Sequence, residues 1–125
     1  MKSSATWKVH YTHYLEGCLV FAGGSKLRFQ IVLGLDEKHN VVEKRYFYGY
    51  FDQQGMRIFQ YDNSPHHPEL TSHPQHVHWG PRPGEGKDDA FELDIPRVDF
   101  IAVVSRVEQL LQERNASGEI EWKRD

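Results

Sequence analysis

The first half of the chain is a series of extended segments joined by very short turns, and this pattern limits the possible folds. In residues 26–33 apolar side chains alternate with Lys26, Arg28 and Gln30, which predicts a strand with one apolar and one cationic face. Similar segments lie at residues 14–21, 41–51 and 56–61, and a Gly23-Gly24 pair marks one of the turns. Because these turns leave no room for helical crossovers, we predict an antiparallel meander.

The segment 41–51, VVEKRYFYGYF, carries aromatic side chains on both faces of its predicted strand. This pattern indicates a central strand that contacts protein on both sides. Gly49 marks a bulge or a close approach to the backbone. A shorter alternation predicts further strands at residues 6–11 and 119–123.

A single long helix is predicted after Pro96, which is a favourable first helical residue. Apolar residues then recur at helical spacing as far as residue 111, and residues 115–118, NASG, end the pattern. The sequence therefore predicts one α+β domain over residues 1–125. Its antiparallel sheet has four to six strands, with one long amphipathic helix packed on one face.

Composition excludes several classes of protein. The 125 residues include one cysteine, Cys18, so we expect neither an intrachain disulfide nor a paired-cysteine zinc motif, and a reducing, cytoplasmic setting fits. A net charge of −3 excludes a protein that coats DNA through bulk positive charge. We find no signal peptide and no apolar run that would span a membrane, so no membrane association is expected.

Residues 61–79, YDNSPHHPELTSHPQHVHW, concentrate the histidines of the chain. Three prolines punctuate this stretch, which predicts an ordered loop at the rim of the sheet, neither helix nor central strand. Imidazole is the side chain that exchanges protons near neutral pH, and it is also a common metal ligand. Five of the eight histidines lie here: His66, His67, His73, His76 and His78.

One hypothesis is a metal-independent ribonuclease. An RNA strand is cleaved when one group removes the 2′-hydroxyl proton and another protonates the leaving oxygen. We assign these two roles to His66 and His76, with His67 and His78 as supporting or substituting groups. Asp62 would orient a histidine, although DNSP is also a good turn sequence in which Asp62 would only bond backbone amides.

The same hypothesis needs groups that bind the substrate. Cations on neighbouring strands would stabilise the charge that develops on the phosphate, and aromatic rings would stack on a base. The candidates are Arg45, Lys44 and Arg57 for the phosphate, and Tyr48, Tyr61 and Trp79 for the base. Sheet packing is the competing interpretation of the strand tyrosines.

Two alternatives remain open. The first is a metal-dependent hydrolase or nuclease in which His66, His73, His76 and His78 hold zinc or manganese. Few carboxylates accompany these histidines, which weighs against a site with two metals. The second is a non-catalytic module, whose aromatic sheet with Lys26, Arg28 and Arg45 binds RNA or a protein.

Three blocks of sequence resemble a known family: Tyr46-Phe47-Tyr48, QYDNSPHHP at residues 60–68 and PQHVH at residues 74–78. They are similar to the TumE-type toxins of prokaryotic toxin–antitoxin pairs, and the likeness spans about residues 15 to 112. In that family the second block reads Arg-Tyr-Asp-Asn-Ala-Pro-His-His and the third Phe-Pro-His-His-x-His. This chain has Gln60, Ser64, His73 and Gln75 at the positions that differ.

The resemblance implies a small growth-inhibiting protein with a ribonuclease role, paired with a helix-turn-helix antitoxin. The family pattern carries over to Asp62, His66, His67, His76 and His78, whereas the substituted positions alter the surroundings of these residues. An exposed sheet edge or the acidic segment 85–94 would mediate antitoxin binding or a homodimer.

Overall fold

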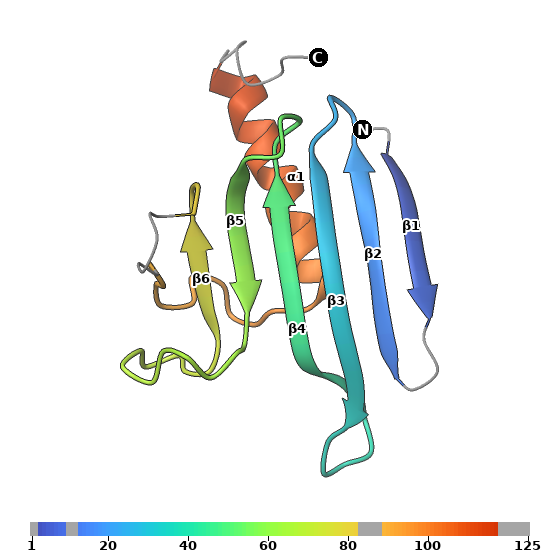
Figure 1. The fold of residues 1–125 in the computed structure, drawn as a ribbon, viewed down its shortest axis with the longest axis vertical. Coiled ribbons are helices and arrows are strands. Elements are labelled where there is room, and N and C mark those ends of the chain that lie inside the picture. Colours follow the sequence, from blue (N-terminus) through green and yellow to red (C-terminus); the bar gives the residue numbers. More distant parts are fainter. Residues whose placement is uncertain (1–2, 10–12, 83–88, 118–125) are drawn as a thin grey trace.

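The computed structural model describes residues 3–9, 13–82 and 89–117. Six strands form one antiparallel sheet in sequence order, and a helix follows them (Figure 1). This arrangement confirms the predicted α+β fold. The elements are β1 (Ser3–Val9), β2 (Tyr14–Phe21), β3 (Lys26–Leu35), β4 (Val41–Phe51), β5 (Arg57–Asp62), β6 (His76–Trp79) and α1 (Phe100–Ser117).

The core lies between α1 and one face of the sheet, with the helix crossing behind β4 in Figure 1. Alternate residues of β3, β4 and β5 point into this layer, as the period of two predicts. From the helix, Val103 and Val107 are fully buried against them. Phe29 meets Phe100 edge to face, with ring centroids 5.1 Å apart.

Three tyrosines of the sheet lie fully buried in this core, and their hydroxyl groups find polar partners at its margin. Tyr48 donates to Glu43, Tyr50 donates to Ser25, and Tyr61 donates to Asp94. Such pairing is what a buried phenol requires. These aromatic side chains therefore hold the fold together.

The opposite face of the sheet is not covered by α1, and we call it the open face. The prediction that β4 is a central strand is confirmed, because it lies between β3 and β5, but the expectation that it contacts protein on both faces is wrong. Phe47 and Phe51 are only partly buried there, and their rings lie over Gly49. A Cβ at Gly49 would come within 2.9 Å of Phe51 and 3.1 Å of Phe47, which explains the glycine as a site of close approach.

The helix begins at Phe100, four residues later than the prediction from Pro96. Asp99 is the reason, because its carboxylate accepts a hydrogen bond from the backbone N–H of Ala102 at 2.8 Å. Glu43 accepts a second bond from the N–H of Phe100 at 3.2 Å. Side-chain caps therefore define this helix start, and the proline lies outside it.

The strands at the two edges of the sheet differ from the predictions. The loop prediction is wrong for residues 76–79, which form the edge strand β6. Residues 6–11 were expected as a strand, whereas β1 covers Ser3–Val9, and the predicted strand at 119–123 lies outside the described residues. Within the described part of the chain, no helix is long and apolar enough to cross a membrane.

The half-buried carboxyl of Glu43 gives the fold a pH dependence of defined sign. Burial raises the pKa of Glu43 above 4.5, against the lowering effect of the bonds from Tyr48 and Phe100. The folded state therefore binds this proton more tightly than the unfolded state, so the free energy of unfolding should fall as pH rises through the range above 4.5.

Urea unfolding of wild type and Glu43→Gln across this pH range tests the account. The free energy of unfolding is expected to decline more steeply with pH in the wild type. Equal slopes would contradict this account.

Candidate active site

Two pairs of polar residues meet on the open face where β5 and β6 run side by side. Asp62 pairs with His76 and Gln60 pairs with His78 in the strand register. The period of two places all four side chains on one face of the sheet. The sheet itself therefore gathers residues that lie fourteen or more positions apart in the sequence.

A third imidazole comes from the loop between β5 and β6. The ring of His67 lies edge-on to His76 and His78, with centroids 4.8 Å and 5.8 Å away. The rings of His76 and His78 are themselves 4.9 Å apart. We call His67, His76, His78 and Asp62 the histidine cluster.

Asp62 is the centre of the histidine cluster. Its Oδ1 lies 2.9 Å from Nε2 of His76, and its Oδ2 lies 3.6 Å from Nε2 of His78. Gln60 Nε2 donates to Oδ2 at 2.9 Å, and Ser64 Oγ donates to Oδ1 at 2.7 Å. Burial alone would raise the pKa of Asp62, but these hydrogen bonds outweigh it and hold the pKa well below its usual range. The carboxylate is therefore ionised at any physiological pH.

The other ring nitrogens of the two strand histidines are held by backbone carbonyls. Nδ1 of His76 lies 3.0 Å from the oxygen of Pro74, and Nδ1 of His78 lies 2.7 Å from the oxygen of Asp89. These contacts lock both rings with Nε2 turned toward Asp62. Because both nitrogens of His76 face oxygen acceptors, only its doubly protonated ring donates to both.

The cluster is deeply buried. The exposed fraction is 1% for His76, 4% for His78 and 8% for His67. Buried ionisable groups persist only when they are paired and hydrogen-bonded, as these are. His67, which also lies 3.3 Å from the carboxylate of Glu69, is thus the imidazole nearest to the surface.

The structure does not bring every predicted histidine into this group. His66 and His73 are exposed and lie outside the set of ring nitrogens within 4.8 Å of one another, which belongs to His67, His76 and His78. His66 is therefore outside the histidine cluster, whereas His76, which was predicted as its acid–base partner, belongs to it.

The predicted aromatic groups lie on the other side of the sheet. Tyr48 and Tyr61 are fully buried in the core, so neither has a ring face available for a base. Trp79 packs against Phe59, and the guanidinium of Arg106 lies 5.2 Å from its ring. These three residues are placed to stabilise the fold.

The predicted cations are divided between surface and interior. Lys44 and Arg45 are exposed on β4. Arg57 is buried, where Nε donates to the carbonyl of Gly80 at 2.9 Å and one terminal nitrogen lies 3.4 Å from Oε1 of Gln60. Gln60 in turn donates to Asp62, so its buried amide links Arg57 to the histidine cluster. Arg57 itself is not at the surface, where a substrate would bind.

Gln60 is the residue of this site that the sequence interpretation missed. The signal was present, because Gln60 and Asp62 alternate on one strand and His76 and His78 alternate on the next. Two such pairs become neighbours whenever the strands are antiparallel. Treating residues 76–79 as loop concealed this relation.

The family model described as Toxin TumE matches residues 5–114 of the chain. Neither the curated proteins nor the solved structures contain a significant match.

Proposed function

Because the chain belongs to the TumE toxin family, and is thus a toxin of a toxin–antitoxin system, we propose that it is an endoribonuclease whose activity depends on the histidine cluster. Its partner is an antitoxin, for which the sequence resemblance suggests the helix-turn-helix class. The observation that carries the proposal is the contact of two imidazoles of β6 with one buried carboxylate, while a third imidazole, from the preceding loop, packs against both of them.

In the metal-free version of this proposal, histidines transfer the protons. One imidazole takes the proton of the RNA 2′-hydroxyl as its oxygen attacks the phosphorus, and a protonated imidazole gives a proton to the departing 5′-oxygen. His67 would contact the substrate, since it is the most exposed ring of the cluster. His76, which Asp62 holds in place beside His67, would exchange protons with His67. The products are a 2′,3′-cyclic phosphate and a 5′-hydroxyl.

A second candidate is a metal-dependent nuclease, and one specific observation favours it. Histidines that bind zinc usually donate their other ring N–H to a carbonyl or carboxylate. His76 and His78 do so toward Pro74 and Asp89, and together with His67 they offer three ring nitrogens within 4.8 Å. These three residues, with Asp62 beside them, would hold zinc or manganese and so activate water.

A digest of defined RNAs by untagged protein tests both versions. We expect cleavage, and the metal-free version expects it to persist in excess EDTA with cyclic phosphate ends. Loss of cleavage in EDTA, restored by zinc or manganese, would assign the metal-dependent version instead. Absence of cleavage under every condition, in protein that still binds RNA, would reject the nuclease in favour of a binding module.

A further inference from the structure

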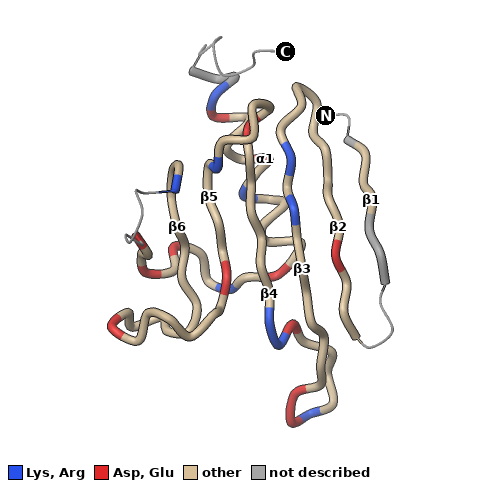
Figure 2. The backbone as a smooth tube through the Cα atoms, in the orientation of Figure 1, with Lys and Arg blue, Asp and Glu red and all other residues tan. Residues whose placement is uncertain are grey.

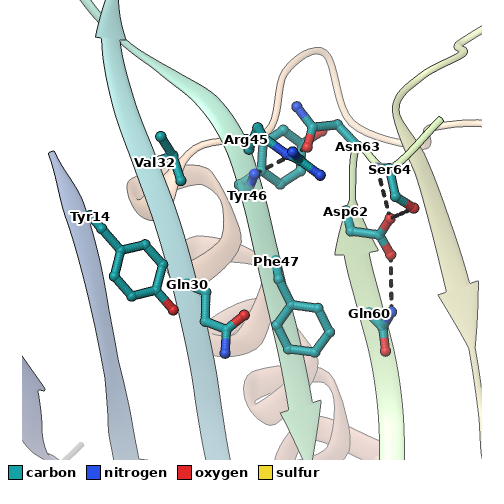
Figure 3. A pocket seen from close by; sticks show the side chains of 10 residues that line it. All are labelled: Tyr14, Gln30, Val32, Arg45, Tyr46, Phe47, Gln60, Asp62, Asn63 and Ser64. Atoms are coloured by element: carbon teal, nitrogen blue, oxygen red, sulfur yellow. Dashed lines mark hydrogen bonds between the residues drawn. The ribbon is translucent and has the colours of Figure 1, made fainter. Parts of the chain in front are cut away.

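The open face carries a hollow directly beside Asp62. It has a volume of about 320 Å³, and side chains of β3, β4 and β5 line it, including Gln30, Arg45, Phe47 and Gln60 (Figure 3). Sites for small ligands have volumes of roughly 300–1,000 Å³. The hollow therefore offers room for one compact ligand group.

The strand register ties this hollow to the histidine cluster. Phe47 on β4 pairs with Asp62 on β5, and Asp62 pairs with His76 on β6. These three side chains form one row across the open face, and Figure 3 shows Phe47 facing the same side as Asp62. With neighbouring strands about 4.8 Å apart, Phe47 and His76 are separated by roughly 10 Å at the backbone. If one unit of a chain-like ligand lay on Phe47, the neighbouring unit would thus lie at the histidine cluster.

A second hollow continues the surface away from the cluster. Its volume is about 370 Å³, it includes Arg28, and it shares Gln30 and Phe47 with the first hollow. Phe47 therefore lies between two adjoining depressions. This arrangement fits a ligand of repeating units better than an isolated small molecule.

The charge of the open face differs from that of the whole chain, which is −3. By the strand register Lys26 and Arg28 on β3 and Arg45 on β4 point to this face and are exposed, and Figure 2 marks basic positions along both strands. Two carboxylates share the face, the partly buried Glu16 on β2 and the buried Asp62 on β5. Acidic side chains are instead frequent in residues 89–99, which run from β6 to the helix. The exposed charges of the open face are thus mainly positive, which complements a polyanion.

We propose that the hollow beside Asp62 binds one nucleotide of a single-stranded RNA, with the base on Phe47, the amide of Gln30 at the base edge and a phosphate at Arg45. The inference rests on the proposed ribonuclease function and specifies its substrate. The strand must be unpaired, because a base can lie on an aromatic ring only when it has left its duplex. An amide carries both a donor and an acceptor, so Gln30 can read a base edge.

Fluorescence anisotropy with a labelled 2′-O-methyl RNA strand tests the proposal, because the blocked 2′-oxygen prevents cyclising cleavage. Phe47→Ala should weaken binding roughly 5- to 150-fold, the range for loss of one base–aromatic stack. Arg45→Gln should reduce the slope of log affinity against log salt by about one. Phe47→Leu retains apolar bulk without the ring, so it should also weaken binding while keeping the wild-type melting temperature.

Matched controls lie elsewhere on the molecule. Phe91 is half exposed beside β6, and the side chain of Arg97 is 82% exposed before α1. Phe91→Ala and Arg97→Gln should bind the strand as the wild type does. The same strand annealed to its complement should be insensitive to Phe47→Ala.

Three results would overturn the proposal. The first is unchanged RNA affinity in Phe47→Leu and Arg45→Gln; if the wild type cleaves RNA, the nuclease function then stands and only the subsite is rejected.

The second is a wild-type dimer that Phe47→Leu converts to a monomer, and the third is antitoxin binding that is lost in Phe47→Leu while RNA affinity is retained. Either outcome would assign the open face to a protein interface. Binding that depends on Phe47 in a protein that never cleaves RNA would keep the subsite and reject the nuclease.

Discussion

Replacing His76 with alanine is expected to reduce the rate of RNA cleavage by about 100-fold or more, within the 10²–10⁴-fold range of a lost proton-transfer group. His76 bonds Asp62 on one side and the carbonyl of Pro74 on the other, so its removal takes away a proton carrier and the order of the cluster. Single-turnover cleavage of a defined RNA, in protein shown by circular dichroism to be folded, measures the effect.

Two histidines outside the cluster complete this experiment. His13 is exposed in the bend before β2, which three strands separate from β6, and His13→Ala should cleave at the wild-type rate. His66 is exposed next to His67, so His66→Ala should lose far less activity than His76→Ala. The reverse order, with His66 essential and His76 dispensable, would show that the buried cluster serves only the fold.

The second large effect is expected on stability. Removing the carboxylate of Asp62 by substitution with alanine should lower the free energy of unfolding by about 3–5 kcal/mol, as for one partner removed from a buried ionic group. The side chains of His76, Gln60 and Ser64 would each lose the acceptor to which they now donate. Urea denaturation in the presence of chelator measures the loss independently of any bound metal.

A less drastic variant and an exposed carboxylate make this test specific. Asp62→Asn keeps the shape and one acceptor, so its loss should be smaller than that of Asp62→Ala. Asp36 also accepts two backbone N–H bonds but lies in the turn before β4. Asp36→Ala should lower the free energy of unfolding much less than Asp62→Ala does, because water can replace these exposed bonds. Equal losses at the two aspartates would contradict the central role of Asp62.

The sheet and helix could be predicted because each has a strong period. Alternation in β3 and helical spacing between residues 100 and 111 are both set by which side chains enter the core. The start of α1 was missed, since Pro96 and Asp99 are both plausible signals and only the capping bond decides between them. Edge strand β6 was missed because four residues, two of them histidines, leave little apolar pattern.

The candidate site could be predicted only in part. The histidine-rich stretch was recognisable by composition, and Asp62 with His76 and His78 was identified. Which of His66 and His67 joins the cluster depends on the path of the loop between Pro65 and Pro68. This path cannot be predicted from the spacing of apolar residues. The strand tyrosines illustrate a related limit: Tyr48 and Phe47 are adjacent aromatic residues, and only the register decides that Tyr48 enters the core while Phe47 faces the hollow.

The strictly sequential order of the strands has a consequence for when the histidine cluster can form during synthesis. Each strand pairs with the one synthesised just before it, so the sheet can assemble progressively as the chain leaves the ribosome. The histidine cluster closes only when β6 joins β5, and the carbonyl of Asp89 that holds His78 emerges later still. The histidine cluster therefore cannot assemble before residue 89 has been synthesised, although the sheet from β1 to β5 can form earlier.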